Sequence, residues 1–90
     1  MNDVVITHAL RTPVGRIRGG LSKVRPDDLS ALVLSALRER SEIDPAALSE
    51  VFWGCANQAG EDNRNVGRMA VVLAGFPYTV PAVTVNRLCA

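Results

Sequence analysis

The sequence predicts a small α/β domain in which strands and helices alternate in the order β-α-β-α-β. Three observations predict this order: short apolar runs typical of strands, an amphipathic and a mostly apolar segment between them, and polar or glycine-containing stretches that separate them. Alternating strands and helices favour a parallel sheet. With 90 residues, the chain forms one domain at most.

The first predicted strand is Val4-Val5-Ile6-Thr7, which is apolar and rich in β-branched residues. Proline and glycines then predict an irregular loop over residues 11–25. A helix follows from Asp27 to Arg40, with Pro26 suited to its start and acidic residues near its positive end. Its expected buried stripe consists of Leu29, Leu32, Val33, Ala36 and Leu37.

Strands and helices also alternate in the second half of the chain. Asp44-Pro45 predicts a capped short turn of helix, and the continuous apolar run 51–56 predicts a strand covered on both faces. A polar loop spans 57–65. Residues 66–74 are apolar nearly all round and predict a buried helix, with Gly75 just after its end. Ala82 to Val85 is the last predicted strand.

Composition excludes several classes of function. The charges are mixed, with a formal net charge of +1, and do not favour nucleic acid or an anionic membrane as partner. No apolar stretch approaches the roughly 20 residues that a membrane span needs, and the N-terminus lacks the pattern of a signal peptide. Cys55 and Cys89 have no short spacing typical of a metal site or disulfide framework. We therefore expect a cytoplasmic protein with reduced thiols, no metal and no bound cofactor.

Cys89 is the strongest candidate for chemistry, because it lies just beyond the last predicted strand. Ligands of open α/β sheets bind outside the carboxyl ends of the strands. A helix after Cys89 would favour the thiolate and supply N–H groups to an oxyanion, as acyl transfer by a cysteine requires. The alternative is an inert thiol in the core.

Three segments in the same order resemble thiolases. Val85-Asn86-Arg87-Leu88-Cys89-Ala90 resembles their nucleophile segment, the run from Arg11 to Gly20 resembles their N-terminal signature, and Val51-Phe52-Trp53-Gly54 with the helix over residues 64–70 resembles their second strand and following helix. The resemblance implies the layered αβαβα thiolase fold, with residues 1–90 as an incomplete N-terminal domain that stops after the third strand. The stretch 54–70 looks most like thiolases that act on 3-oxoadipyl-CoA in aromatic-compound degradation.

The resemblance also implies an activity. The Cys89 thiolate would attack the ketone of a 3-oxoacyl-CoA, release acetyl-CoA and pass the shortened acyl group to free coenzyme A, the co-substrate. A histidine and a second cysteine, both from the family's C-terminal half, would complete the site. The full-length enzyme would be a dimer or tetramer. We expect no turnover from this chain alone, and an ordinary thiol pKa of about 8.5 for Cys89 without these partners.

Weaker candidates remain open. His8 is expected to be a loop histidine and Cys55 a core thiol. Arg11, Arg16 and Arg18 lie beside glycines, which suits a phosphate, but they match no phosphate-binding fingerprint.

Glu61 and Asp62 form an acidic pair suited to acid–base work, although solvation on a polar loop is the simpler interpretation. A contact between subunits is a third. The alternative for the whole chain is a non-catalytic interaction or assembly module. Ketoacyl synthases also place a cysteine on a similar fold.

Overall fold

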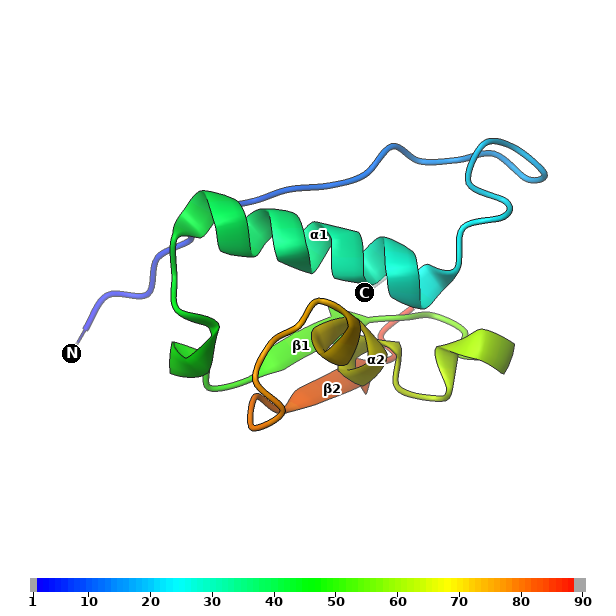
Figure 1. The fold of residues 1–90 in the computed structure, drawn as a ribbon. Coiled ribbons are helices and arrows are strands. Elements are labelled where there is room, and N and C mark those ends of the chain that lie inside the picture. The colour runs from blue at the N-terminus through cyan, green and yellow to red at the C-terminus, as the bar shows by residue number, and fades with distance from the viewer. Residues whose placement is uncertain (1, 89–90) are drawn as a thin grey trace.

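The computed structural model describes residues 2–88. Its elements are α1 (Pro26–Ser41), the 3-10 turn η1 (Pro45–Ala47), β1 (Val51–Gly54), the 3-10 turn η2 (Gly60–Asp62), α2 (Val66–Leu73) and β2 (Ala82–Val85). The two strands pair in parallel, with Val51 opposite Ala82 and Gly54 opposite Val85. Helix α2 packs against both strands and against α1, which runs along one side of them (Figure 1). The α/β class and the parallel pairing are confirmed.

Helix α1 begins and ends within one residue of the prediction. Pro26 occupies its first turn, where a missing N–H costs nothing, and acidic side chains follow in that turn. Arg38 and Arg40 lie in the last turn, where positive charge is favourable. Glu42, in the left-handed conformation at φ 57°, ends the helix.

The buried face of α1 differs from the prediction. Leu32 is 62% exposed, whereas the buried residues are Asp27, Ser30, Ala31 and Leu34. Two of these are polar, and each is satisfied locally: Asp27 pairs with Arg25, and the Ser30 hydroxyl donates to the Pro26 carbonyl at 2.7 Å. A buried face that carries satisfied polar groups is not visible as an apolar stripe.

Helix α2 is confirmed over Val66–Leu73, with Gly75 at φ 75° just after it. The prediction that this helix is buried holds for one side only, where Val66, Gly67, Ala70 and Val71 are buried. Val71 is completely buried, but Val72 and Leu73 are 53% and 49% exposed. The reason is that α1 and the strands cover only one side of the helix in the described part of the chain.

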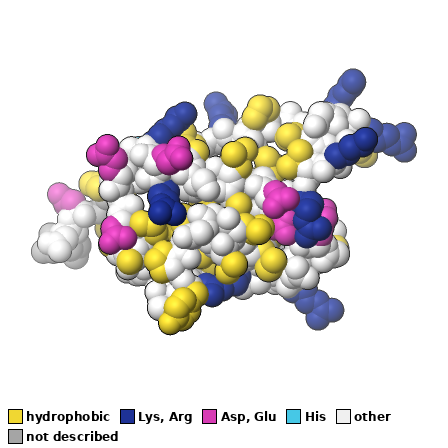
Figure 2. All heavy atoms as spheres, in the orientation of Figure 1, with side chains coloured by type: hydrophobic (Ala, Val, Ile, Leu, Met, Phe, Trp, Pro, Cys, Tyr) yellow, Lys and Arg dark blue, Asp and Glu magenta, His cyan; other side chains and the backbone are white. Residues whose placement is uncertain are grey.

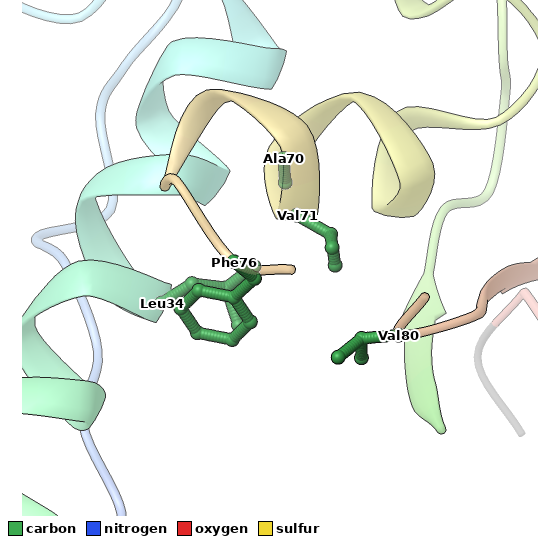
Figure 3. Close-up of a cluster of buried hydrophobic side chains, with 5 residues drawn as sticks. All are labelled: Leu34, Ala70, Val71, Phe76 and Val80. Atoms are coloured by element: carbon green, nitrogen blue, oxygen red, sulfur yellow. The ribbon is translucent and has the colours of Figure 1, made fainter. Parts of the chain in front are cut away.

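The core lies where α1, α2 and the turn before β2 meet. Figure 3 shows Leu34, Val71, Phe76 and Val80 turned toward this region, with Ala70 on α2 beside them. These residues are all at most 9% exposed. Partly buried side chains extend the cluster to the sheet: Leu48, Val51, Trp53, Ala74 and Ala82. The core therefore fixes α2 against the strands.

Strand β1 is covered on one face only. Trp53 packs against the core cluster, as does Val51, whereas Phe52 is 68% exposed on the opposite face. The prediction of a strand covered on both faces is therefore wrong for the described residues. The physical reason is that α2 covers one side of this two-stranded sheet and no described element covers the side of Phe52.

The predicted strand at residues 4–7 is also wrong. Val4 and Ile6 are 98% and 91% exposed, and the segment has no ladder with β1 or β2. In Figure 1 its trace passes the C-terminal end of α1 without joining either strand. A pattern of β-branched residues suits a strand, but a strand also needs a neighbour for its backbone N–H and C=O groups.

The connections follow the predictions more closely. Asp44 Oδ1 accepts from the backbone N–H of Ala46 at 3.0 Å and caps η1. Residues 11–25 contain turns but no helix or strand, and the loop 57–65 contains only η2. Among residues 2–88, no helix is long and apolar enough to cross a membrane.

Candidate active site

The carboxyl ends of β1 and β2 lie at the same edge of the sheet. The backbone N–H of Cys55, just after β1, donates to the carbonyl of Val85, the last residue of β2, at 3.0 Å. The segments that follow the two strands therefore start side by side. Cys89 follows Val85 by four residues, but it lies outside the described residues.

Residues 86–88, which follow β2, are exposed, and the hydrogen bond that they form among the described residues is a local turn. Asn86 Oδ1 accepts from the backbone N–H of Leu88 at 3.3 Å, and Leu88 has a left-handed φ of 49°. Such an Asx turn reverses the direction of the chain within a few residues. Leu88 is 74% exposed.

A polar network joins the N-terminus of α2 to β2. Asn65 Oδ1 accepts from the backbone N–H of Arg68 at 3.1 Å and from the Thr84 hydroxyl at 2.7 Å. The Thr84 oxygen in turn accepts from the N–H of Gly67 at 3.0 Å, and Asn65 Nδ2 donates to the Ala82 carbonyl at 3.3 Å. We call Asn65, Gly67, Thr84 and Ala82 the α2–β2 junction.

Sequence reasoning missed this junction. Asparagine directly before an apolar helix is a recognisable N-cap signal. The bond from the backbone N–H of Arg68 to Asn65 Oδ1 could therefore be predicted from the sequence. The pairing of Asn65 with Thr84 was not, because 19 residues separate them and nothing local signals the contact.

The structure keeps His8 away from the segment that leads to Cys89. His8 is exposed and lines a mostly apolar groove of about 280 Å³ beside α1. That groove reaches Val51, the first residue of β1, and the preceding Glu50, at the opposite end of the strand from Cys55. His8 is therefore a loop histidine, as expected. Cys55 is half-buried just after the strand, so the prediction of a core thiol holds only in part.

The acidic pair has structural contacts. Glu61 Oε2 lies 3.0 Å from Arg25 Nη1, which joins η2 to the start of α1. Asp62 is only 6% exposed, contrary to the expectation of a solvated carboxylate, and its Oδ2 accepts from the N–H of Ala59 at 3.3 Å. This bond satisfies one carboxylate oxygen, whereas Oδ1 is buried with no hydrogen-bond partner among the described residues. The two carboxylates therefore face different partners.

The arginines expected beside a phosphate lie on the exposed loop 11–20, and Figure 2 shows basic side chains projecting into solvent at that end of the molecule. None of Arg11, Arg16 and Arg18 lines the groove beside α1 or the second hollow, which is lined by Gln58, Ala59, Gly60, Asn63 and Arg64. Within the described ranges there is also no group of three or more histidine, cysteine or acidic side chains that could hold a metal ion.

The chain matches a known protein family. The family model described as "Thiolase, N-terminal domain" matches residues 4–90, nearly the whole chain. The chain belongs to the thiolase family. The match includes the β1 and β2 segments, the α2–β2 junction and Cys89.

Individual thiolases agree with the family match. The chain is 64% identical over 89 residues to a beta-ketoadipyl-CoA thiolase of Pseudomonas aeruginosa, covering 98% of this chain and 22% of that protein. It is 52% identical over 90 residues to a 3-oxoadipyl-CoA/3-oxo-5,6-dehydrosuberyl-CoA thiolase of Escherichia coli K12, covering 99% of this chain and 22% of that protein. The chain thus spans about a fifth of the length of these relatives.

A solved structure supports the fold. The crystal structure of the Bacillus anthracis acetyl-CoA acetyltransferase matches with a TM-score of 0.79 and 35% sequence identity. The match covers 87% of this chain and 20% of that chain. The arrangement of helices and parallel strands in this thiolase segment therefore recurs in a solved acetyltransferase.

Proposed function

We propose that this chain is an incomplete N-terminal domain of a thiolase-type acyltransferase and that Cys89 is its nucleophile. The observation that carries the proposal is the family match, which extends to residue 90 and so includes Cys89 just after β2. The position supports the role, because a residue that follows the carboxyl end of a parallel strand reaches the edge where α/β folds bind ligands.

The proposed reaction has two acyl transfers. The Cys89 thiolate attacks the ketone carbon of a 3-oxoacyl-CoA, the bond between that carbon and the α-carbon breaks, and the α-carbon takes a proton to give acetyl-CoA. The shortened acyl group stays on sulfur as a thioester. The thiolate of free coenzyme A then attacks this thioester, which releases the shortened acyl-CoA and restores the Cys89 thiolate.

The substrate we propose is 3-oxoadipyl-CoA. Two relatives that share 64% and 52% identity with this chain carry beta-ketoadipyl-CoA or 3-oxoadipyl-CoA in their names. The Bacillus anthracis acetyltransferase, at 35% identity, carries a different name. The higher identity to the first two supports the dicarboxylic substrate over acetoacetyl-CoA.

The described residues place no histidine at the end of β2 that leads to Cys89. His8 borders the start of β1, and Cys55 contributes a backbone N–H to the end of β2. We therefore infer that the activating histidine and the proton-shuttling cysteine come from a part of the enzyme that this chain does not contain. The exposed face of Phe52 supports a further inference that the complete enzyme is a homo-oligomer or covers this face with its own later segments.

A chimera tests the proposal. In it, this chain replaces the matching residues of the Pseudomonas aeruginosa relative, and the protein is assayed for acetyl-CoA release from 3-oxoadipyl-CoA and coenzyme A. We expect turnover, an acyl group on the Cys89 peptide by mass spectrometry when coenzyme A is omitted, and loss of both in Cys89→Ala. Cys55→Ala is the matched control and should retain activity.

Two outcomes would count against the proposed role of the chain and of Cys89, and a third against the proposed substrate. An active chimera that keeps its activity after Cys89→Ala would show that another group carries the acyl chain. An inactive but folded chimera would favour the alternative that this segment is a non-catalytic interaction or assembly module. A chimera that prefers acetoacetyl-CoA would overturn the substrate assignment alone.

A further inference from the structure

The α2–β2 junction makes more contacts than a helix cap requires. A cap needs one bond from the side chain to a free N–H of the first turn, and the bond from Arg68 N to Asn65 Oδ1 provides it. The other three bonds connect residues 17 or 19 positions apart and reach from α2 to β2. They therefore fix the helix to the strand and do more than end the helix.

Close packing reinforces these bonds. A Cβ atom added at Gly67 would lie 2.8 Å from the Cβ of Trp53 and 3.2 Å from the Thr84 hydroxyl oxygen. The helix can approach the strands this closely only because residue 67 has no side chain. The short distance brings the N–H of Gly67 within 3.0 Å of Thr84.

The junction lies at the end of β2 that leads to Cys89. Thr84 is the next-to-last residue of β2, and Cys89 follows it by five residues. Beyond Thr84, and apart from the ladder that pairs β2 with β1, the hydrogen bonds among residues 2–88 are the one from Cys55 N–H to the Val85 carbonyl and the local one between Asn86 and Leu88. The direction in which the chain leaves the sheet therefore depends on how firmly Thr84 and Val85 are held.

We propose that Asn65 and Thr84 are positioning residues for the nucleophile, an inference that rests on the proposed role of Cys89. The Thr84 hydroxyl donates to Asn65 and accepts from Gly67, so it fixes the strand end in two directions. Without the hydroxyl, the Gly67 N–H loses its acceptor, and the partly buried groups must rearrange. The start of the Cys89 segment then shifts relative to α2.

A shift of this kind affects the reaction more than substrate binding. Attack of sulfur on the ketone carbon needs a near-attack geometry, and a misplacement of about 1 Å can lower the rate about a hundredfold. Neither Asn65 nor Thr84 has to contact the substrate for this effect. The expected signature is a lower kcat at unchanged KM, which marks the loss of an effect realised only in the transition state.

Arg68 provides a matched control at the other end of β2. Its Nη1 and Nη2 donate to the carbonyls of Val80 and Tyr78, at 2.8 and 3.0 Å, just before the strand begins. Arg68→Met therefore removes two hydrogen bonds between the same helix and the chain before the same strand, but at the end distant from Cys89. This variant therefore measures the effect of weaker contacts between α2 and the chain before β2, while the side chains of the junction stay unchanged.

The experiment uses the active chimera and compares Thr84→Val, Thr84→Ser, Asn65→Ser and Arg68→Met. Valine keeps the shape of threonine without the hydroxyl, serine at 84 keeps the hydroxyl, and serine at 65 keeps a cap but loses the donor to Ala82. We expect Thr84→Val and Asn65→Ser to lower kcat about ten- to a hundredfold with KM within about twofold. Thr84→Ser should restore most of the rate, and Arg68→Met should lower the Tm while kcat stays within about twofold.

The second readout is alkylation of the Cys89 peptide by iodoacetamide against pH, measured by mass spectrometry. In the chimera, Thr84→Val should move the thiol pKa upward toward about 8.5, because the displaced sulfur loses its activating neighbours, and Arg68→Met should leave it unchanged. A merely structural junction would lower the Tm without moving this profile.

The outcomes separate this inference from the proposed function. Equal losses of kcat in Thr84→Val and Arg68→Met, or a failure of Thr84→Ser to restore the rate, would overturn the positioning role while Cys89 acylation stays intact. If Thr84→Val does not fold, Asn65→Ser decides, and an unchanged kcat in that variant overturns the inference. If the unmodified chimera forms no acyl group on Cys89, the proposed function itself fails.

Discussion

Arg25 holds the carboxylate of Asp27 at both oxygens. Its Nε and Nη2 donate to Oδ1 and Oδ2 at 3.1 and 3.0 Å, and Asp27 is only 2% exposed although Arg25 is about half exposed. A bidentate pair of this kind is among the stronger polar contacts in proteins. Because Arg25 also reaches Glu61 at 3.0 Å, it ties the first turn of α1 to η2.

The first prediction concerns acid stability. The side-chain hydrogen bond from Arg25 lowers the pKa of Asp27, and it outweighs the burial that acts in the opposite direction. A carboxylate whose pKa is lower in the folded state contributes stability above its unfolded pKa of about 3.9 and loses it as the pH falls through the folded value. We therefore expect the free energy of unfolding to decrease as the pH is lowered below about 4.

Asp27→Asn tests this expectation by urea unfolding of the chain, followed by the fluorescence of its one tryptophan, Trp53. The variant should lose about 1–3 kcal/mol at pH 7 and less at acidic pH, where the wild-type carboxylate is protonated. Asp28→Asn is the matched control in the same helical turn, because Asp28 is exposed. Equal losses in the two variants would contradict a special role for the pair with Arg25.

The second prediction concerns the core. Val71 is 0% exposed and lies among the side chains of Figure 3, whereas the next residue, Val72, is 53% exposed. Val71→Ala should lower the free energy of unfolding by about 2 kcal/mol, since it removes buried methyl groups and leaves a cavity. Val72→Ala should change it by less than about 0.5 kcal/mol. Urea unfolding at one pH distinguishes these values, and similar losses would show that α2 packs differently.

The sequence predicts local elements well and long-range relationships poorly. The bounds of α2 and β2 follow from apolar runs, a glycine and a proline, all of which act within a few residues. The buried face of α1 could not be predicted, because Asp27 and Ser30 are buried through contacts that hydropathy does not report. Residues 4–7 carry the composition of a strand, but composition does not supply the neighbour on which a strand depends.

The candidate site likewise has one part that the sequence predicts and one part that only the fold reveals. Cys89 stands out in the sequence because it follows an apolar strand, and its role as nucleophile is a proposal that rests on the resemblance to thiolases. The junction of Asn65 with Thr84 depends on the distance between a helix and a strand, which only the fold establishes. The burial of Asp62 in a polar loop likewise depends on how the loop folds, which brings its Oδ2 within 3.3 Å of the backbone nitrogen of Ala59.

The third prediction concerns self-association of the isolated chain. In the parallel register Phe52 lies beside Val83, on the face of the sheet opposite Trp53 and Thr84. Phe52 is 68% exposed there, and uncovered apolar sheet faces promote association. We expect sedimentation velocity to show species larger than the monomer as concentration rises. Phe52→Ser should shift the distribution toward monomer, whereas Leu32→Ser, on exposed α1 surface, should not.

The fourth prediction concerns the reactivity of Cys89 in the chain alone. A cysteine becomes a strong nucleophile when a base, a cation or a helix N-terminus stabilises its thiolate, and residues 2–88 place no histidine near the end of β2. Alkylation of the Cys89 peptide against pH should therefore give a pKa near 8.5 for the chain and a lower value for the chimera. The chain alone should not turn over 3-oxoadipyl-CoA.

Comparison of the Cys89 thiol pKa between the chain and the chimera shows which part of the enzyme activates the sulfur. The same cysteine, preceded by the same strand and junction, is measured with and without the remainder of a thiolase. If the thiol pKa is equally low in both, β2 and its junction activate the sulfur by themselves, and the inferred need for an outside histidine is wrong. If it is near 8.5 in the chain and low in the chimera, the junction positions a sulfur that other segments activate, so positioning and activation come from different parts of the enzyme.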